Sequence, residues 1–340
     1  MKSSLAALTL VFVLLGCGGP SSMSHTSQPQ SAIALPAVAL WPLERGQEVY
    51  WTPFSQSGVQ IQFADVPLRN NARVTSVLAN SRNELAASNG MRFDALGRLW
   101  VLNFGHFHGN PGSVCVFDLP LTENSKPRYT FVLTGTIDPE HLTFDASGNL
   151  WVSDAPYNSV VSEYTGPFNR SGSLSPALTV TKGLQYPQGL AFDSHGNLYV
   201  ANSKSSGVHS VAVFTAPVSN RQPYFLNGLD NPVGLAFDAA GNLYASDNYA
   251  SLSAIVRYDS DHLKAGARPD VVNMTALHEI FEADFAFTAS GDLYFTNCGT
   301  FPSIDWYPTS RQPFTARLAP SVSYSDDAID AGCAWGIAIK

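Results

Sequence analysis

The sequence has few charged residues, few cysteines and no long hydrophobic run after its first fifteen residues. Charged residues make up 14% of the 340, and 27 acidic against 19 basic residues give a net charge of −8. A nucleic-acid-binding surface needs a basic patch or stripe, so we expect no nucleic-acid partner. No stretch after residue 17 is long and apolar enough to cross a membrane.

Several motifs of nucleophilic and phosphate chemistry are also missing. The chain contains no Gly-x-Ser-x-Gly turn, no phosphate-binding glycine loop and no Cys-x-x-Cys pair. Hydrolysis by an activated serine therefore has no support. Hydrophobic residues are abundant instead, at 45%, with 26 Gly and 22 Pro, a composition that we interpret as one secreted β domain.

One phrase recurs five times along the chain. In Leu190–Ser203 (LAFDSHGNLYVANS), an alternating run, an Asp-x-x-Gly turn and a second alternating run follow one another, which is the pattern of a β-hairpin. The other copies are Met91–Phe104, Leu142–Ala155, Leu235–Asn248 and Phe285–Cys298. A period of about fifty residues with all-β units predicts propeller blades rather than helical repeats.

The second half of each repeat contains two further stretches that we predict to be third and fourth strands. The predicted outer strands are Arg128–Leu133, Ala177–Thr181, Pro223–Leu226, Pro269–Asn273 and Phe314–Leu318. Near the C-terminus, Trp335–Lys340 matches the first strand of a repeat, with no hairpin after it. Residues 49–79 match the second to fourth strands of a repeat, with no first strand before them. A blade shared between these segments would close the ring and remove exposed sheet edges. The sequence therefore predicts an all-β, six-bladed β-propeller of four-stranded blades over residues 48–340.

Residues 1–17 have the features of a bacterial lipoprotein signal peptide. Lys2 precedes the apolar run Leu5–Leu15, and the sequence ending in Gly16-Cys17 resembles a lipobox. Cleavage before Cys17 would leave this cysteine carrying the lipid, whereas the alternative is an ordinary signal peptide with a chance cysteine. Residues 18–47 are polar and are interpreted as a tether and lead-in. We expect a monomer held by a lipid bilayer in the bacterial cell envelope.

Three cysteines lie in the β region. Cys298 ends a second strand and Cys333 precedes the next first strand, so a propeller would bring them together and Cys298–Cys333 is a candidate disulfide. Cys115 alternates with apolar residues and is expected to be a buried free thiol. Simple filling of the core is the alternative for all three.

The two residues just before each innermost strand are expected to surround the mouth of the central channel, and we call them the mouth pairs. They are Asn89-Gly90, Glu140-His141, Gln188-Gly189, Val233-Gly234, Ala283-Asp284 and Trp335-Gly336. Four of them have Gly in second place, whereas two have His141 and Asp284 there. These two departures, with Glu140, are the candidate catalytic residues, because carboxylates and an imidazole can hold a cation or transfer protons. The candidate binding residues are Asn89, Gln188 and Trp335; mere solvation of the mouth is the alternative.

Two other groups of polar residues follow the second strands. His106 and His108 in the stretch Asn103–Asn110 would point the same way on an extended segment, as metal-binding pairs do, although a solvated loop is the alternative. An Asn or Asp ends every second strand: Asn103, Asp154, Asn202, Asp247 and Asn297. Because all five repeats share it, we expect a structural role, capping the turn into the third strand.

The five phrases resemble the blades of NHL-repeat and gluconolactonase/senescence-marker-protein-like propellers, which share an x-Gly-Leu-Ala-x-Asp…Gly-x-Leu-Tyr-Val-x-Asp pattern. The resemblance covers roughly residues 48–340 and is specific for architecture because it recurs. The resembled lactonases hold a divalent metal at the mouth through Glu, Asn and Asp, which implies Asn89, Glu140 and Asp284 as ligands of Ca²⁺ or Zn²⁺. Val233 and Trp335 occupy mouth positions without a ligand atom, so this set is incomplete.

We interpret the protein as a lipid-anchored propeller that acts as a binding or scaffold module for a small molecule, a glycan or a protein at the channel mouth. The alternative is a metal-dependent, lactonase-like hydrolase or a propeller-type lyase that uses Glu140, His141 and Asp284. A structural envelope protein without a ligand is the third interpretation. The fold alone does not decide among them.

Overall fold

The structure, a computed structural model, describes residues 47–53, 59–78, 85, 88–105, 111–155, 158–203, 209–248, 254–274, 284–298, 302–309, 320–326, 329 and 334–340. These ranges belong to one unit, residues 43–340, and consist mostly of β-strands, with a short 3-10 helix, η2 (Ser260–His262). Across the ranges given above, no helix has the length and hydropathy needed to span a membrane. The predicted signal peptide with Cys17, and nearly all of the tether, lie outside the described residues.

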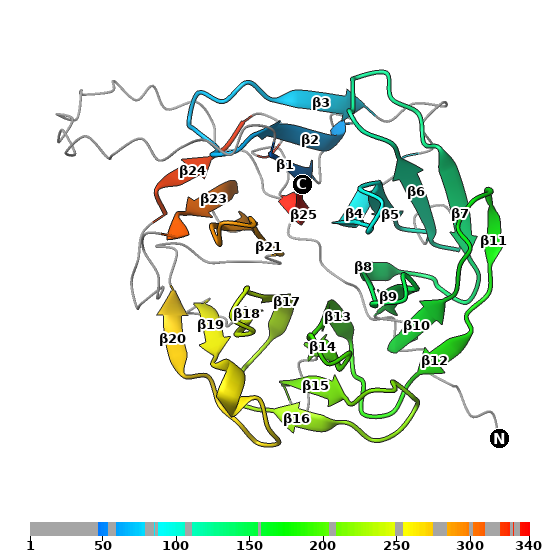
Figure 1. Ribbon diagram of the computed structural model, residues 1–340, viewed down its shortest axis with the longest axis vertical. Helices are drawn as coiled ribbons and strands as arrows, with labels where there is room; N and C mark the ends of the chain where they lie inside the picture. Colours follow the sequence, from blue (N-terminus) through cyan, green and yellow to red (C-terminus); the bar gives the residue numbers. More distant parts are fainter. Residues whose placement is uncertain are drawn as a thin grey trace, which may run out of the picture. The chain divides into compact units, whose positions relative to one another are not determined.

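Six sheets surround a central axis, each with one strand next to the axis (Figure 1). From the innermost strand outward, the sheets are β25 (Ala334–Ile339), β1 (Glu48–Pro53), β2 (Val59–Asp65), β3 (Thr75–Leu78); β4 (Ser88–Phe93), β5 (Leu99–Asn103), β6 (Ser113–Phe117), β7 (Tyr129–Leu133); β8 (Pro139–Phe144), β9 (Leu150–Asp154), β10 (Val160–Tyr164), β12 (Leu178–Val180); β13 (Pro187–Phe192), β14 (Leu198–Asn202), β15 (Ser210–Phe214), β16 (Tyr224–Leu226); β17 (Pro232–Phe237), β18 (Leu243–Asp247), β19 (Ala254–Tyr258), β20 (Val271–Met274); and β21 (Phe285–Phe287), β22 (Leu293–Asn297), β23 (Ser303–Tyr307), β24 (Val322–Tyr324). The predicted six-bladed β-propeller is confirmed.

The first of these sheets joins segments from near the two ends of the sequence. β25 pairs antiparallel with β1, with Val49 opposite Ile339 and Trp51 opposite Ile337. β1 in turn pairs with β2, and β2 with β3. The blade that the sequence predicted to be shared is therefore present, and it closes the ring.

Two outer strands differ from the prediction. β11 (Gly172–Leu174) lies between β10 and β12 in the sequence but pairs in parallel with β7 of the preceding sheet, which gives that sheet a fifth strand. Three residues that begin with Gly carry no alternating pattern, so the sequence did not indicate this strand. In the last sheet the fourth strand is β24, whereas the predicted Phe314–Leu318 lies outside the described residues.

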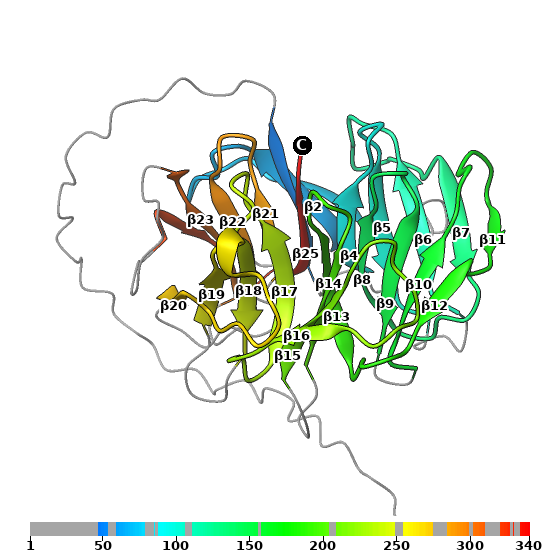
Figure 2. The same ribbon diagram turned by 60° about the horizontal axis from the view of Figure 1, so that its bottom comes forward.

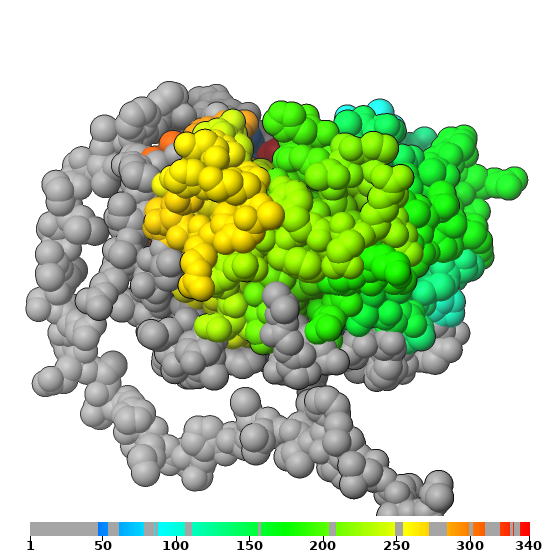
Figure 3. Space-filling view, turned by 90° about the horizontal axis from the view of Figure 1, so that it is seen from below, coloured from blue at the N-terminus to red at the C-terminus, as the bar shows by residue number. Residues whose placement is uncertain are grey.

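The hydrophobic core lies between neighbouring sheets, and one aromatic contact recurs in it. An aromatic residue on the second strand of each of five blades packs edge-to-face on the Phe near the end of the next blade's innermost strand. The pairs are Tyr50–Phe93, Trp100–Phe144, Trp151–Phe192, Tyr199–Phe237 and Tyr244–Phe287, with ring centroids 5.0 to 5.6 Å apart. Each such pair contributes about 0.5–1.5 kcal/mol beyond its buried area. The repeated phrase thus contributes to the contact between neighbouring blades at five junctions of the ring. Figure 2 shows the blades side by side, and in Figure 3 the segments coloured green to yellow form a continuous surface.

The hairpin turns are the predicted ones. The Asp193 side chain accepts hydrogen bonds from the backbone N–H groups of His195 and Asn197, both at 2.9 Å. Gly196 has φ +80°, a left-handed conformation that favours glycine. The same pair of bonds is made by Asp94, Asp145 and Asp238. These aspartates are therefore structural.

The residues that end the second strands are also bonded to backbone, but not where the sequence predicted. The Asp154 carboxylate accepts the N–H groups of Ile137 (3.0 Å) and Asp138 (2.7 Å), which lead into the innermost strand of the same blade. Asn202 accepts from Gln185 in the same way (3.0 Å). These bonds support a structural role, but their backbone donors precede the innermost strand rather than the third strand. Asp154 also accepts from the Asn158 side chain (2.7 Å), in the turn into the third strand. The loop before the innermost strand runs beside the second strand's end and leaves its N–H groups without ladder partners.

Two of the cysteines lie among the described residues. Cys115 is buried and free, as predicted. Cys298 is disulfide-bonded, and its sulfur lies 3.3 Å from the carbonyl oxygen of Ala334. Its predicted partner, Cys333, lies outside the described residues.

Candidate functional site

Each mouth pair whose strand pairing is described lies in a β-bulge. In β13, Pro187 is opposite Asn202 and Leu190 is opposite Val200, so Gln188 and Gly189 together oppose one residue of β14. The register shifts in the same way in β4, β8, β17 and β25. A bulge releases two residues per blade from the ladder and brings them to the ring centre.

A hydroxyl group on the second strand connects the bulges of neighbouring blades. Ser153 Oγ accepts the N–H of His141 (3.0 Å) and donates to the carbonyl oxygen of Gln188 in the next blade (2.7 Å). The corresponding bridges are Gly336–Thr52–Asn89, with distances of 2.8 and 2.5 Å, and Asp284–Thr296–Trp335, with distances of 2.9 and 3.4 Å. These bonds fix the backbone of the mouth pairs, and the sequence analysis did not detect them.

The glycines of the mouth pairs are explained by close approach between blades. A Cβ atom on Gly189 would lie 2.3 Å from the carbonyl oxygen of Val233, and one on Gly336 would lie 2.3 Å from that of Asn89. Such distances are not tolerated, so glycine is required there for packing. His141 and Asp284 occupy the same position in their own blades, where each introduces a side chain.

These two side chains approach each other across the axis. β8, which carries His141, contacts β4 and β13, whereas β21 contacts β17 and β25, so the two strands lie on opposite sides of the ring (Figure 1). His141 Nδ1 nevertheless lies 3.9 Å from Asp284 Oδ1. The two departures from the glycine pattern therefore belong to one cluster.

The partner of Asp284 is Arg92, which lies on β4 and was not among the predicted site residues. The Arg92 guanidinium binds the carboxylate with two nitrogens, Nη1 to Oδ2 at 2.8 Å and Nη2 to Oδ1 at 2.9 Å. Asp284 also accepts the N–H groups of Phe285 (2.9 Å) and Ile337 (3.2 Å), and its side chain is 0% exposed. We call Arg92, His141 and Asp284 the cross-axis cluster.

A sequence signal for Arg92 exists. It occupies the second residue after the mouth pair, where the other innermost strands have small side chains: Thr143, Ala191, Ala236, Ala286 and Ala338. A long cationic side chain at a position that is otherwise Ala or Thr is as clear a departure from the repeat as His141.

The charges of the cross-axis cluster follow from its contacts. Burial alone would raise the pKa of Asp284, but the positive charge and hydrogen bonds of Arg92 hold the pKa of this carboxyl below its usual range. Burial lowers the pKa of His141, with a further contribution from the nearby Arg92 charge, against the attraction of Asp284. At neutral pH the cluster thus contains one cation, one anion and a neutral imidazole.

The other mouth residues divide into a polar and an apolar part. Asn89, Glu140 and Gln188 lie on the consecutive sheets of β4, β8 and β13, and Asn89 Nδ2 donates to Glu140 Oε2 at 3.3 Å. Trp335 on β25 is half-buried and packs edge-to-face on Phe104, with ring centroids 5.4 Å apart. Val233 on β17 is buried. Ala283 and the candidate metal pair His106 and His108 lie outside the described residues.

The predicted metal set does not fit the observed contacts. Both carboxylate oxygens of Asp284 are bonded to the Arg92 guanidinium. A divalent cation bound to these oxygens would be repelled by the positive charge of the guanidinium. Of the proposed ligands, only Asn89 and Glu140 lie outside this ion pair, and they bond each other. The geometry therefore argues against Asp284 as a metal ligand, and the proposed cation has two candidate ligands here.

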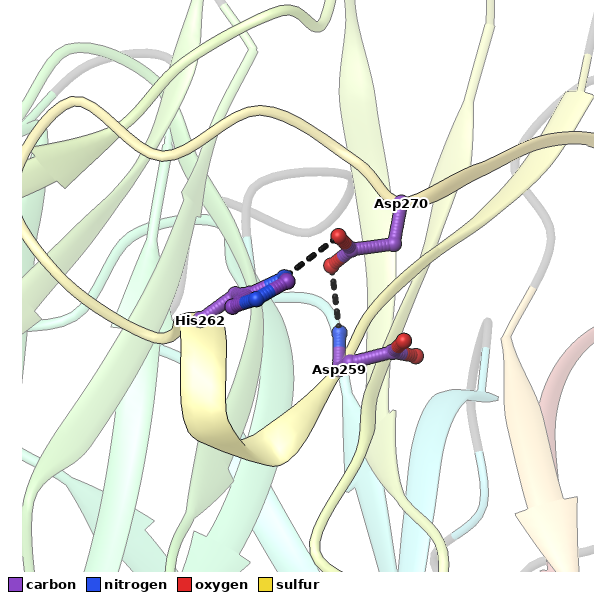
Figure 4. A group of neighbouring side chains, drawn as sticks. All are labelled: Asp259, His262 and Asp270. Atoms are coloured by element: carbon purple, nitrogen blue, oxygen red, sulfur yellow. Dashed lines mark hydrogen bonds and ion pairs between the residues drawn. The ribbon is translucent and has the colours of Figure 1, made fainter.

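A different group of potential ligands lies near the outer strands of the β17 sheet (Figure 4). Atoms of Asp259, His262 and Asp270 lie within 4.8 Å of one another, and within the described ranges no other His, Cys, Asp and Glu side chains gather in this way. His262 Nδ1 is 2.5 Å from Asp270, which also accepts the N–H of Asp259 (2.8 Å). Asp259 pairs with Arg257 at 2.7 Å. These contacts already give each of the three side chains a hydrogen-bond or ion-pair partner. The group is largely exposed and lies away from the mouth pairs.

The comparison with known protein families finds one match. Residues 184–214, which include the mouth pair Gln188-Gly189, match the NHL repeat. No curated protein matches the sequence.

Solved structures share the fold at low sequence identity. A protein of unknown function from Bacteroides caccae has a TM-score of 0.52 and 11% identity, covering 86% of this chain and 98% of its own. A putative 6-phosphogluconolactonase from Bacteroides uniformis has a TM-score of 0.55 and 12% identity, covering 82% of both chains. A gluconolactonase from Xanthomonas campestris has a TM-score of 0.46 and 18% identity, covering 73% of this chain and 82% of its own. The first two similarities are evidence for the propeller architecture only.

Proposed function

We propose that the protein is a binding module whose mouth pairs take a small polar ligand with an apolar face, such as a sugar ring of a glycan. The observation that carries this proposal is the division of the mouth into an amide–carboxylate–amide side and an aromatic side. Asn89, Glu140 and Gln188 offer donors and acceptors on three consecutive sheets. Trp335, held by Phe104, offers a large apolar surface with little loss of side-chain entropy.

The electrostatics of the mouth favour an uncharged ligand. The Arg92 charge is balanced by Asp284 at 2.8 Å, and the imidazole of His141 is kept neutral by burial. Glu140 adds a negative charge at the half-buried level of the mouth. A phosphorylated or strongly acidic ligand would be repelled by this carboxylate, and the Arg92 charge is already engaged by Asp284.

A glycan-array experiment tests the proposal. Purified protein should bind a subset of immobilised mono- and oligosaccharides, and Trp335→Ala and Glu140→Gln should each weaken binding at least about tenfold, a loss of about 1.4 kcal/mol. Glu123→Gln, an exposed Glu on the loop after β6, is the matched control and should bind like the parent. Binding that neither mouth variant weakens, or a folded protein that binds nothing on the array, would refute the proposal.

A second candidate is hydrolysis of a sugar lactone, and one observation favours it. His141 and Asp284, from opposite sides of the ring, lie within 3.9 Å, and Glu140 directly precedes His141. Because burial keeps His141 neutral, its imidazole is able to accept a proton at neutral pH. In this candidate, Glu140 or His141 activates a water molecule for attack on the lactone carbonyl, and the proton returns to the ring oxygen that leaves.

The lactone reaction is tested with glucono-δ-lactone, whose hydrolysis releases acid that an indicator reports. A rate above the spontaneous one, reduced about 100-fold or more by Glu140→Gln or His141→Asn, would support it. The assay is run with and without EDTA, because the metal-dependent form of this candidate requires loss of rate on chelation. An unaltered spontaneous rate with folded protein eliminates the candidate. The lipid anchor at Cys17 and the envelope location are proposed as before and are tested by metabolic labelling with a fatty acid.

A further inference from the structure

We propose that the Arg92 guanidinium is the resident cation of this propeller, in the place of the divalent metal that the resemblance implies. In this proposal Asp284 binds no metal in the native protein, and a cation site made by Asn89, Glu140 and Asp284 becomes available only when Arg92 is removed. The proposal concerns the cross-axis cluster and does not depend on the ligand proposed above.

The first argument is the completeness of the ion pair. Asp284 is fully buried, and each of its oxygens accepts one guanidinium nitrogen and one backbone N–H. A carboxylate that binds Ca²⁺ or Zn²⁺ must direct an oxygen lone pair at the ion, with a metal–oxygen distance of about 2.0–2.6 Å. In Asp284 the four hydrogen-bond donors already occupy the lone pairs of both oxygens.

The second argument is how Arg92 itself is held. Nη1 also donates to the carbonyl oxygens of Met91 (2.9 Å) and Ile337 (2.8 Å), so the guanidinium joins the sheets of β4, β25 and β21. Those bonds hold the guanidinium against backbone and carboxylate oxygens of three sheets. A bidentate pair of this kind is specific to arginine, because lysine offers a single point charge.

The third argument is that Arg92 retains donors. Its side chain is 20% exposed, and among the described residues Nη2 bonds only Asp284 while Nε bonds none. Remaining N–H groups of a buried, fixed guanidinium suit a carbonyl or hydroxyl oxygen of a ligand, which is the interaction that a Lewis-acidic metal would otherwise supply.

Metal titration of the whole protein tests the proposal without any sugar. After dialysis against EDTA, Ca²⁺ or Zn²⁺ is added to about 1 mM and the Tm is measured. We expect no shift for the parent, a lowered Tm for Arg92→Met that Ca²⁺ or Zn²⁺ raises by about 5 °C, and no metal response for the double variant R92M/D284N. All proteins carry Asp270→Asn, which removes the surface group of Figure 4 as a source of metal binding.

The results that overturn the proposal are distinct. A parent protein that binds Ca²⁺ or Zn²⁺ and loses this on Asp284→Asn shows that Asp284 is a native ligand. A folded Arg92→Met that ignores both metals shows that no latent site exists. If Arg92→Met does not fold, the parent and Arg92→Lys decide, because a fixed positive charge should keep both insensitive to metal.

Discussion

The two ends of the innermost strands differ in what they share. At the hairpin end, four blades have the same Asp with the same two backbone bonds, and the fifth uses Thr288, whose hydroxyl accepts from Asp292. At the mouth end the backbone bulge recurs, but the side chains range from Asn and Gln to Trp. Repetition along the chain therefore identifies architecture, and the positions that depart from it carry the individual properties of the protein.

The largest expected effect contrasts an aspartate from each end. Asp284→Ala leaves the Arg92 guanidinium largely buried without its partner, which we expect to lower the free energy of unfolding by about 3–5 kcal/mol. Asp238→Ala removes hydrogen bonds to two backbone N–H groups of the turn, which water can replace in part. We expect the free energy of unfolding to fall by about 1 kcal/mol. Urea unfolding measures both, and equal losses would contradict the distinction between the two ends.

Glycines from each end provide a second contrast. Gly189→Ala places a Cβ 2.3 Å from a backbone oxygen of the next blade, and we expect a loss of about 3 kcal/mol. Gly148→Ala meets no atom within 4 Å and suffers only from φ +80°, for a loss of about 1 kcal/mol. Thermal unfolding of the two variants decides, and the close-approach explanation fails if Gly148→Ala is the more damaging.

The pH dependence of stability tests the buried imidazole. His141 is 6% exposed and its pKa is lowered, so its contribution is present above the ordinary pKa of about 6.5 and is lost as the pH falls through the folded value. In that window the unfolded chain binds a proton that the folded chain does not. The free energy of unfolding should therefore fall by up to about 1.4 kcal/mol per pH unit below pH 6.5. His141→Asn should flatten this slope, and an unchanged slope would show that His141 is not responsible.

The smallest expected effect concerns the exposed histidine of Figure 4. The hydrogen bond that His262 donates to Asp270 raises the pKa of His262, so this residue should titrate above the ordinary value. Its small contribution to stability is lost as the pH rises through that pKa. NMR titration of the imidazole in the parent and in Asp270→Asn measures the shift. A histidine that titrates identically in both would mean that the pair does not form in solution.

The blade count, the shared blade and the Asp-x-x-Gly turns could be predicted because each rests on a local pattern that recurs. β11 could not, since three residues pair with a strand some forty positions earlier and leave no periodic trace. At the site, His141 and Asp284 were found as breaks in the repeat. Their contact across the axis could not be predicted from the sequence. Aligned repeats show which positions correspond between blades, but they give no distance between opposite blades. Arg92 was missed for a simpler reason: its position was not compared.

The pairing of β25 with β1 has a consequence for how the chain folds. Val49 and Ile339 are about 290 residues apart, so the contact that closes the ring has the highest loop-closure cost in the fold. β1 keeps an open edge until Ala334–Ile339 pairs with it, whereas the middle blades pair strands that are close in the sequence. We expect this seam to be the last part to assemble and the first to open under strain.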